Sequence, residues 1–234
     1  MSLAVRDMTV VELMDDPDCD ARRLRATLRR FGTVNRLVSG WGIVYRTRLA
    51  PHLASLERPA RVLDVGSGGG DLVLRLAALA RRDGLEVEWT GVDPDPRAHA
   101  VAAEREAPST VTWRCADAAT LIAEGASFDV VLSNHVMHHL GDELGEFAVH
   151  SRQLARGLVL HGDIERSRLA YGLYAVGITP LAPGTFLRTD GLRSIRRSFT
   201  RDELAGAFGR IAPGAWSVHT PAPFRLLAAA DGLG

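Results

Sequence analysis

Val62-Leu63-Asp64-Val65-Gly66-Ser67-Gly68-Gly69-Gly70-Asp71 is a short apolar run that passes directly into a glycine-rich turn. The apolar half predicts a buried strand, and the apolar residues spaced through 72–82 predict a helix after the turn. Glycine lets backbone N–H groups approach a ligand closely, and the start of a helix favours negative charge. One interpretation of this stretch is therefore a ligand-binding loop, and the other is a tight turn that binds nothing.

On both sides of this loop, short apolar runs alternate with segments long enough for helices. Strands are expected at 61–65, 87–92, 111–115, 128–133 and 157–161. The segments 72–82 and 96–107 read as helices. Such alternation requires crossover connections, so it predicts an α/β fold with a mostly parallel sheet and helices on both faces.

The chain is expected to divide at about residue 55. Asp20 is a good helix cap, and Leu24 and Leu28 recur on one helical face after it, so residues 1–55 read as an N-terminal helical cap. Residues 56–234 form the ligand-binding domain, and about 164–199 is expected to be an insertion made of one helix and a long loop. Thr200 begins a further helix, and the runs 216–220 and 224–229 predict a closing antiparallel hairpin.

The composition excludes several classes of function. Lysine and arginine together number 28, all of them arginine, and 28 acidic residues balance them. Without lysine, the chain cannot form a P-loop or a Schiff base from its own side chains. Zero net charge argues against a general nucleic-acid binder, because phosphate neutralisation needs surplus cations. Two cysteines and no apolar run near the roughly 20 residues of a membrane span favour a cytoplasmic protein.

Acidic residues follow the next two expected strands. Asp93 ends one strand and can accept both hydroxyls of a ribose, while Asp117 follows the next strand and can face an adenine amino group. Taken alone, each of these two residues is equally well explained as a solvated loop carboxylate. Together with the glycine loop they follow three consecutive parallel strands, whose carboxyl ends lie at one edge of the sheet, where ligands bind. A nicotinamide fingerprint fails because its last glycine position falls on Asp71. An acidic loop suits a ligand with a cationic amino-acid end better than a pyrophosphate.

Residues 60–161 resemble the class I S-adenosylmethionine-dependent methyltransferases, through an Asp-x-Gly-x-Gly-x-Gly loop and an acid after each of the next two strands. The resemblance implies a Rossmann-like, mostly parallel seven-stranded sheet whose last strand is antiparallel. It also assigns the residues that hold the donor, S-adenosyl-L-methionine. Those for its methionine part are Asp64, Gly66, Ser67, Gly68 and Gly70; those for its ribose are Asp93 and Pro94; those for its adenine are Asp117 and Ala118; and Asn134 ends the fourth strand beside the methyl group.

A weaker resemblance concerns the helical cap. Phe31, Asn35, Ser39 and Gly40 are similar to the segment before the glycine loop in the ubiquinone and menaquinone C-methyltransferases, with a spacing that departs by about one residue. It implies a hydrophobic or aromatic acceptor.

Methyl transfer from a sulfonium is an in-line displacement, so the protein aligns the acceptor, excludes water and, for a hydroxyl or an acidic carbon, removes a proton. Histidine suits proton removal near neutral pH. His135 and His139 are the expected pocket pair, since only one of His138 and His139 would point into the cleft if both begin a helix. Histidines that only cap or pack are the alternative.

The end of the fifth expected strand carries two further possibilities. His161, Asp163 and Glu165 have a spacing that suits a metal site, but we identify no residue elsewhere that completes a ligand set, so no metal is expected. Asp163 alone would serve as a base or orient the acceptor. Five arginines flank the insertion, where they would form either an anion clamp or a solvated basic face: Arg166, Arg168, Arg193, Arg196 and Arg197.

The sequence therefore predicts a methyltransferase acting on oxygen or carbon of a small hydrophobic acceptor of the phenolic, quinone-like or polyketide kind. We expect no nucleic-acid partner and no membrane span. Two alternatives stay open, a nicotinamide-dependent oxidoreductase and a donor-binding regulator without catalytic activity.

Overall fold

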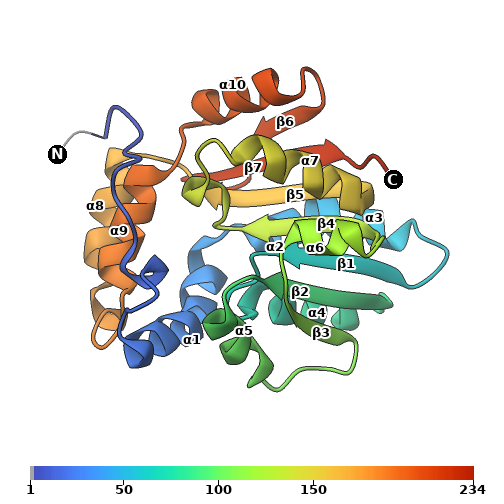
Figure 1. The fold of residues 1–234 in the computed structure, drawn as a ribbon, viewed down its shortest axis with the longest axis horizontal. Coiled ribbons are helices and arrows are strands. Elements are labelled where there is room, and N and C mark those ends of the chain that lie inside the picture. Colours follow the sequence, from blue (N-terminus) through green and yellow to red (C-terminus); the bar gives the residue numbers. More distant parts are fainter. Residues whose placement is uncertain (1–2) are drawn as a thin grey trace.

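The computed structural model describes residues 3–234, and its centre is a seven-stranded sheet in the order β3-β2-β1-β4-β5-β7-β6 (Figure 1). The strands are β1 (Ala60–Val65), β2 (Val87–Asp93), β3 (Val111–Cys115), β4 (Phe128–Asn134), β5 (Ala155–Ile164), β6 (Trp216–His219) and β7 (Arg225–Asp231). Strands β1 to β5 are parallel, and β7 runs antiparallel to both β5 and β6. The predicted sheet and its closing hairpin are confirmed.

Helices surround this sheet. They are η1 (Leu13–Asp15), α1 (Ala21–Val38), α2 (Trp41–Val44), η2 (Tyr45–Leu49), α3 (Ala50–Ala54), α4 (Asp71–Arg82), α5 (Pro96–Ala103), α6 (Ala118–Ala123), η3 (Met137–His139), α7 (Leu144–Leu154), α8 (Arg168–Gly177), η4 (Thr179–Leu181), α9 (Leu187–Arg197) and α10 (Arg201–Ile211). Within residues 3–234, no helix combines the length and the apolar character needed to cross a bilayer.

Alternate residues of β1 enter two hydrophobic cores, one on each face of the sheet. Val62 lies in one core with Leu76 of α4 and Leu49 of η2. Leu63 lies in the other core with Leu121 of α6. Successive strand residues point to opposite faces, so a strand covered on both sides reads as a continuous apolar run. The predicted helices on both faces are confirmed.

The first 55 residues do two different things in this fold. Helix α1 begins after Asp20, whose carboxylate accepts hydrogen bonds from the N–H groups of Arg22 and Arg23, and it lies beyond the carboxyl ends of β1 and β4 (Figure 1). By contrast, Trp41 and Leu49 are fully buried in the core that β1 shares. The expected domain boundary near residue 55 stays a prediction.

The segment 164–199 contains a second helix that we did not expect. Helices α8 and α9 lie side by side in it, joined by η4, and they extend past the same end of the sheet as α1 (Figure 1). The face that α9 buries includes Asp190, Ser194 and Arg197 as well as Leu187 and Ile195. Leu187 and Ile195 lie on this buried face and the other arginines on the opposite one, so α9 is amphipathic and the sequence carried a helix signal that we missed.

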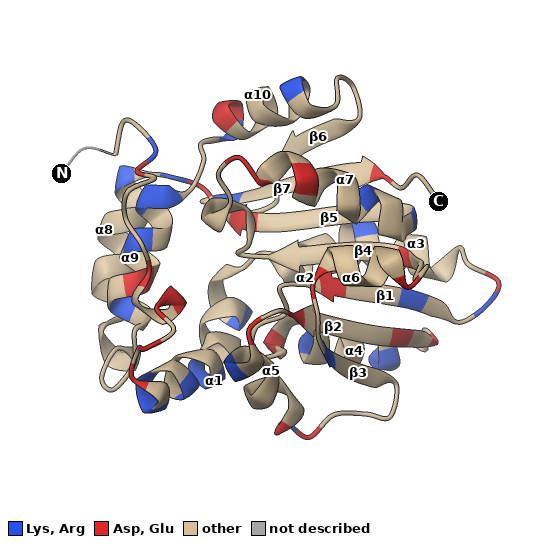
Figure 2. Cartoon of the chain, viewed as in Figure 1, with Lys and Arg blue, Asp and Glu red and all other residues tan. Residues whose placement is uncertain are grey.

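Buried polar groups on and near α9 hold the N-terminal segment against this helix by hydrogen bonds. The carboxylate of Asp190 accepts hydrogen bonds from the N–H groups of Leu13 (2.9 Å) and Met14 (3.0 Å). Arg166 donates to the carbonyl of Leu3 (3.1 Å), and Arg197 donates to that of His139 (3.1 Å). Figure 2 shows arginines on α1 and α9 beside the acidic residues of the crossing segment. Arg166 and Arg197 are therefore buried and hydrogen-bonded to the protein, and they are not part of a solvated face.

Candidate active site

A cavity of about 1390 Å³ opens at the carboxyl ends of β1, β2 and β4 and is covered by α1, α8 and α9. Every residue predicted to hold the donor lines it except Gly70, and so do His135 and His139. This agrees with the rule that ligands of open α/β sheets bind beyond the carboxyl ends of the strands.

The glycine loop is held in place by its own backbone. The N–H groups of Gly66 and Ser67 both donate to the carbonyl of Val92 at 2.9 Å, and the N–H of Gly68 donates to Asp93 Oδ2 at 2.8 Å. Gly66 has a φ of +72°, and a Cβ there would lie 2.6 Å from Val136. A side chain at this position is therefore excluded both by backbone conformation and by space.

Gly70 has a structural task in the same loop. Its φ of +76° places it as the left-handed residue before α4, and a Cβ would lie 2.5 Å from the ring of Trp113. The same ring fills the space beside Gly91. Gly70 thus packs against Trp113 rather than facing the cavity, and no local sequence signal distinguishes it from Gly68.

The carboxylates around the loop are short of hydrogen-bond donors. Asp64 is buried, and its Oδ1 has no hydrogen-bond partner among the described residues. Burial, followed by the charges of Asp71 and Asp93, raises the pKa of Asp64 well above its ordinary value. Burial also raises the pKa of Asp93, although its carboxylate accepts hydrogen bonds from the backbone of Gly68 and Asp95. A ligand with an ammonium group would supply a donor here and lower these pKa values.

Helix α1 contributes to the loop, which the sequence did not indicate. Asn35 donates from Nδ2 to Asp71 Oδ2 at 3.0 Å, and burial raises the pKa of that carboxyl despite this hydrogen bond. Arg75 donates to the carbonyl of Asn35 at 2.9 Å and fixes the end of α1. The predicted cap is thus in direct contact with the donor loop.

Two predicted donor residues also carry structural contacts. Asp117 caps α6, because its Oδ1 accepts hydrogen bonds from the N–H (2.8 Å) and the hydroxyl (2.7 Å) of Thr120. Asn134 Oδ1 accepts a hydrogen bond from Trp41 Nε1 at 3.0 Å. Pro94 and Ala118 line the cavity beside them. The donor roles of these four residues stay predictions.

His135 follows β4 in an unusual backbone conformation. Its φ is +64°, rare for a residue with a side chain, and its N–H donates to the carbonyl of Gly162 at 2.9 Å. Burial, followed by the positive charge of Arg225, lowers the pKa of His135 to about 3. At neutral pH this imidazole is therefore uncharged. It also lines the cavity.

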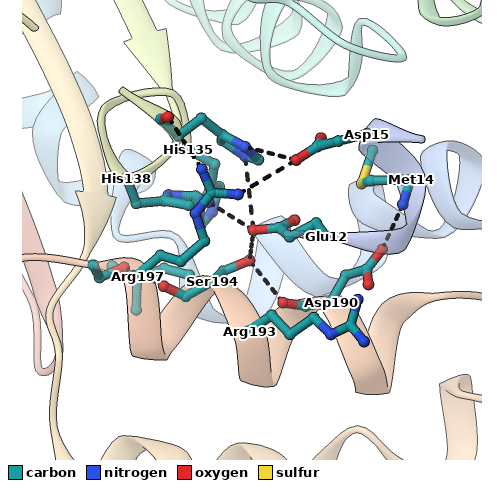
Figure 3. A network of polar contacts seen from close by, with 12 residues as sticks. Glu12, Met14, Asp15, His135, His138, Asp190, Arg193, Ser194 and Arg197 are labelled. Atoms are coloured by element: carbon teal, nitrogen blue, oxygen red, sulfur yellow. Dashed lines mark hydrogen bonds and ion pairs between the residues drawn. The ribbon is translucent and has the colours of Figure 1, made fainter. Parts of the chain in front are cut away.

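The adjacent histidines meet two carboxylates from the N-terminal segment (Figure 3). His138 Nδ1 lies 2.7 Å from Asp163 Oδ1, and its Nε2 lies 3.2 Å from Glu12 Oε1. His139 Nδ1 lies 3.3 Å from Asp15 Oδ2. Burial alone would lower the pKa of His138, but the carboxylates of Asp163 and Glu12 outweigh it and raise that pKa to about 10.

Both His138 and His139 line the cavity; only one was expected to do so if they began a helix, and they end a 3₁₀ turn instead. Their turn is a short 3₁₀ helix that Glu12 crosses, and Glu12 is close to both rings. More than a hundred residues separate Glu12 from this turn in the sequence. The polar contacts of α9 help to hold Glu12 in this position, and no sequence motif indicates it.

Part of the chain matches known methyltransferases in sequence. A family model described as "Methyltransferase domain" matches residues 62–157. The ubiquinone biosynthesis O-methyltransferase of Cereibacter sphaeroides is 35% identical over 121 residues, which are 50% of this chain and 46% of the relative. That of Roseobacter denitrificans is 34% identical over 131 residues, 53% of this chain and 50% of the relative. The chain thus spans about half the length of the curated relatives it matches.

Solved structures with low sequence identity share the fold. The plantazolicin methyltransferase BamL, in complex with a triazolic desmethylPZN analog and SAH, has a TM-score of 0.64 and 16% identity, with 92% of this chain and 96% of that chain covered. The CurJ carbon methyltransferase has a TM-score of 0.65 and 16% identity, with 93% of this chain and 62% of that chain covered.

Proposed function

From the premise that the chain carries a class I S-adenosylmethionine-dependent methyltransferase domain, we propose that it methylates oxygen or carbon of a small hydrophobic acceptor. The acceptor class is phenolic, quinone-like or polyketide. A nicotinamide-dependent activity is not favoured, because the family match covers the same loop that departs from the nicotinamide fingerprint at Asp71.

The observation that supports this proposal best is one cavity with two different ends. Its volume of about 1390 Å³ exceeds the roughly 300–1,000 Å³ of a pocket for one small ligand, so it has room for a donor and an acceptor together. The glycine loop and Asp93 line one part, while Phe31 of α1, Ile178 and Leu187 bring apolar side chains from the covering helices.

The residues at the loop suit the donor. Bound S-adenosyl-L-methionine supplies a methyl group already activated on a sulfonium. The carboxylate of Asp64, with its unpartnered Oδ1, can accept a hydrogen bond from the ammonium of the donor. Asp93 is held by Gly68 and Asp95 in a position to accept hydrogen bonds from ribose hydroxyls.

The exposed face of α8 supports a hydrophobic acceptor. Leu169, Leu173 and Val176 recur at i, i+4 and i+7 on that helix and are mostly exposed, and Leu173 also lines the cavity. An apolar stripe that continues into a cavity suits an acceptor with an alkyl chain, because both surfaces lose contact with water together.

His135 and His139 are the proposed proton acceptors. The low pKa of His135 keeps its imidazole neutral, so it can accept a hydrogen bond from an acceptor hydroxyl and take the proton as the oxygen is methylated. His139 is oriented by Asp15, in the way that carboxylates fix imidazole rings in other catalytic sites.

Calorimetry with S-adenosylhomocysteine tests the donor site, and product formation tests catalysis. We expect micromolar binding that falls at least tenfold in Asp93→Asn, since that change removes the carboxylate that accepts hydrogen bonds from both ribose hydroxyls. Absence of binding by folded protein contradicts the proposal. Binding without turnover on any acceptor supports the donor-binding regulator instead.

The protein is also proposed to be cytoplasmic and to take no nucleic acid. The thiols of Cys19 and Cys115 are free, as in reducing compartments, and cations balance anions at 28 each. Crosslinking to RNA in cell extract, compared with a known RNA-binding protein, tests the second statement, and specific crosslinks contradict it.

A further inference from the structure

Two neighbouring imidazoles at the cavity are arranged in the same way. Each presents Nδ1 to a carboxylate, His138 to Asp163 at 2.7 Å and His139 to Asp15 at 3.3 Å. Each places Nε2 near one oxygen, Oε1 of Glu12, at 3.2 Å for His138 and 3.8 Å for His139. Two imidazole nitrogens and a carboxylate oxygen therefore lie within 4.8 Å of one another, and Figure 3 shows Glu12 beside His138.

The orientation of the His138 ring is set by its surroundings. Asp163 is fixed as an acceptor, because the backbone N–H groups of His138 (2.8 Å) and Ile164 (2.7 Å) both donate to it. Nδ1 is then the nitrogen that donates to Asp163. Nε2 is buried and has no hydrogen-bond partner among the described residues, although Glu12 is close.

We infer that Glu12, His138 and His139 form a binding site for a divalent transition-metal ion of the zinc class. Imidazole nitrogens with one carboxylate suit zinc or iron rather than magnesium or calcium, and three protein ligands leave coordination positions open. Asp163 and Asp15 would orient the rings from behind, as carboxylates do for most metal-bound histidines. Ser194 donates to Glu12 Oε1 at 2.7 Å and fixes that carboxylate as well.

A second set of possible ligands shares His138 but is less suitable. His135, His138 and Asp163 also lie close together. There, however, the His138 nitrogen on that side already donates to Asp163, and the Nδ1 of His135 is 3.9 Å from that carboxylate. On the Glu12 side a metal ion would displace the proton of Nε2 and leave the bond from Nδ1 to Asp163 in place. No metal was expected, because the set weighed in the sequence was His161, Asp163 and Glu165; Glu12, His138 and His139 are a different set.

The position of the site indicates what an ion would do. Glu12, His138 and His139 all line the cavity beside His135, so the open coordination positions face the acceptor space. Given the proposed function, an acceptor with two neighbouring oxygens, such as a catechol or a 1,3-dicarbonyl, would bind the ion and lose its proton more easily. The ion would occupy the Nε2 lone pair of His139, which leaves His135 as the proton acceptor.

Zinc binding to the full chain, without donor or acceptor, tests the inference independently of methyl transfer. Chelator-treated protein is dialysed against buffered zinc, and bound metal is measured by mass spectrometry. We expect about one zinc ion per chain. His139→Gln should weaken binding at least tenfold, and Asp15→Asn, behind the ring, by about tenfold or more. His219→Gln removes a histidine far from the site and serves as the matched control.

Cobalt substitution adds a readout that folding alone does not change. Visible absorption of the cobalt protein should show imidazole and carboxylate ligation, and it should change in His139→Gln but not in His219→Gln. Circular dichroism checks that each variant is folded. Folded wild type that binds no zinc overturns the inference and leaves His138 as an imidazolium between two carboxylates. Equal zinc affinity in wild type and His139→Gln overturns it too.

Discussion

Gly68 and Gly70 occupy the same motif, but we predict that replacing them with alanine has different consequences. Gly68 has a φ of +53°, and a Cβ there would meet its nearest neighbour, a methyl of Leu28, at 3.9 Å. Gly70 has a φ of +76°, and a Cβ there would lie 2.5 Å from the ring of Trp113. That ring also lies against Gly91, so it cannot move in that direction.

The two costs follow from these contacts. A left-handed conformation costs a residue with a side chain about 1–2 kcal/mol, and both variants carry that cost. Gly70→Ala adds the overpacking of a ring, roughly 1–3 kcal/mol. The free energy of unfolding should therefore fall by about 1–2 kcal/mol in Gly68→Ala and about 2–5 kcal/mol in Gly70→Ala. Donor affinity should fall at least tenfold only in Gly68→Ala, because Gly68 lines the cavity and Gly70 does not.

Urea unfolding followed by tryptophan fluorescence measures the first quantity, and calorimetry with S-adenosylhomocysteine measures the second. Calorimetry is done at a temperature at which both variants are folded. The reasoning is refuted if Gly70→Ala is no more destabilising than Gly68→Ala, or if the loss of affinity falls on Gly70→Ala.

Three further substitutions test other parts of the fold. Burial opposes ionisation of Asp129, but hydrogen bonds from Arg58 and from a backbone N–H outweigh it and lower the pKa of this carboxyl. The carboxylate therefore stabilises the fold above the unfolded pKa of about 3.9, and this stabilisation is lost as pH falls through the folded pKa. Asp129→Asn should destabilise by about 1–3 kcal/mol at pH 7 and progressively less in acid unfolding series, whereas a constant difference contradicts this. Thr200→Ala should cost about 1 kcal/mol by thermal unfolding, through loss of the cap of α10, and no change contradicts the cap. Trp41→Phe should weaken donor binding by freeing Asn134, and unchanged calorimetry argues against that link.

Local patterns in the sequence account for most of the fold. The run into the glycine loop and the alternation after it predict the strands, the helices and a mostly parallel sheet, because each pattern is complete within a few neighbouring residues. Even the capping role of Asp117 has a local signal, since a threonine follows three residues later, as in other helix caps. We predicted only a contact with adenine for Asp117, and the capping contact does not exclude that role.

The acceptor side of the site was less predictable, for a physical reason. Glu12 and Asp15 reach the histidine turn because residues far along the chain bind the N-terminal segment, among them Asp190 and Arg197 of α9. Those contacts join residues about 180 positions apart, and a local sequence pattern does not indicate which buried polar groups will meet. Gly70 was assigned to the donor because the sequence around it does not show its contact with Trp113, which lies in β3, far along the chain.

Methyl transfer itself is the most direct test of the proposed function. The full chain is incubated with isotopically labelled S-adenosylmethionine and with phenolic, quinol and polyketide acceptors, and the organic extract is analysed by mass spectrometry. We predict a labelled methyl group on at least one acceptor, equal in amount to the S-adenosylhomocysteine formed, with a raised donor KM in Asp93→Asn. Donor that binds but yields no S-adenosylhomocysteine above the protein-free rate with any acceptor would contradict the account.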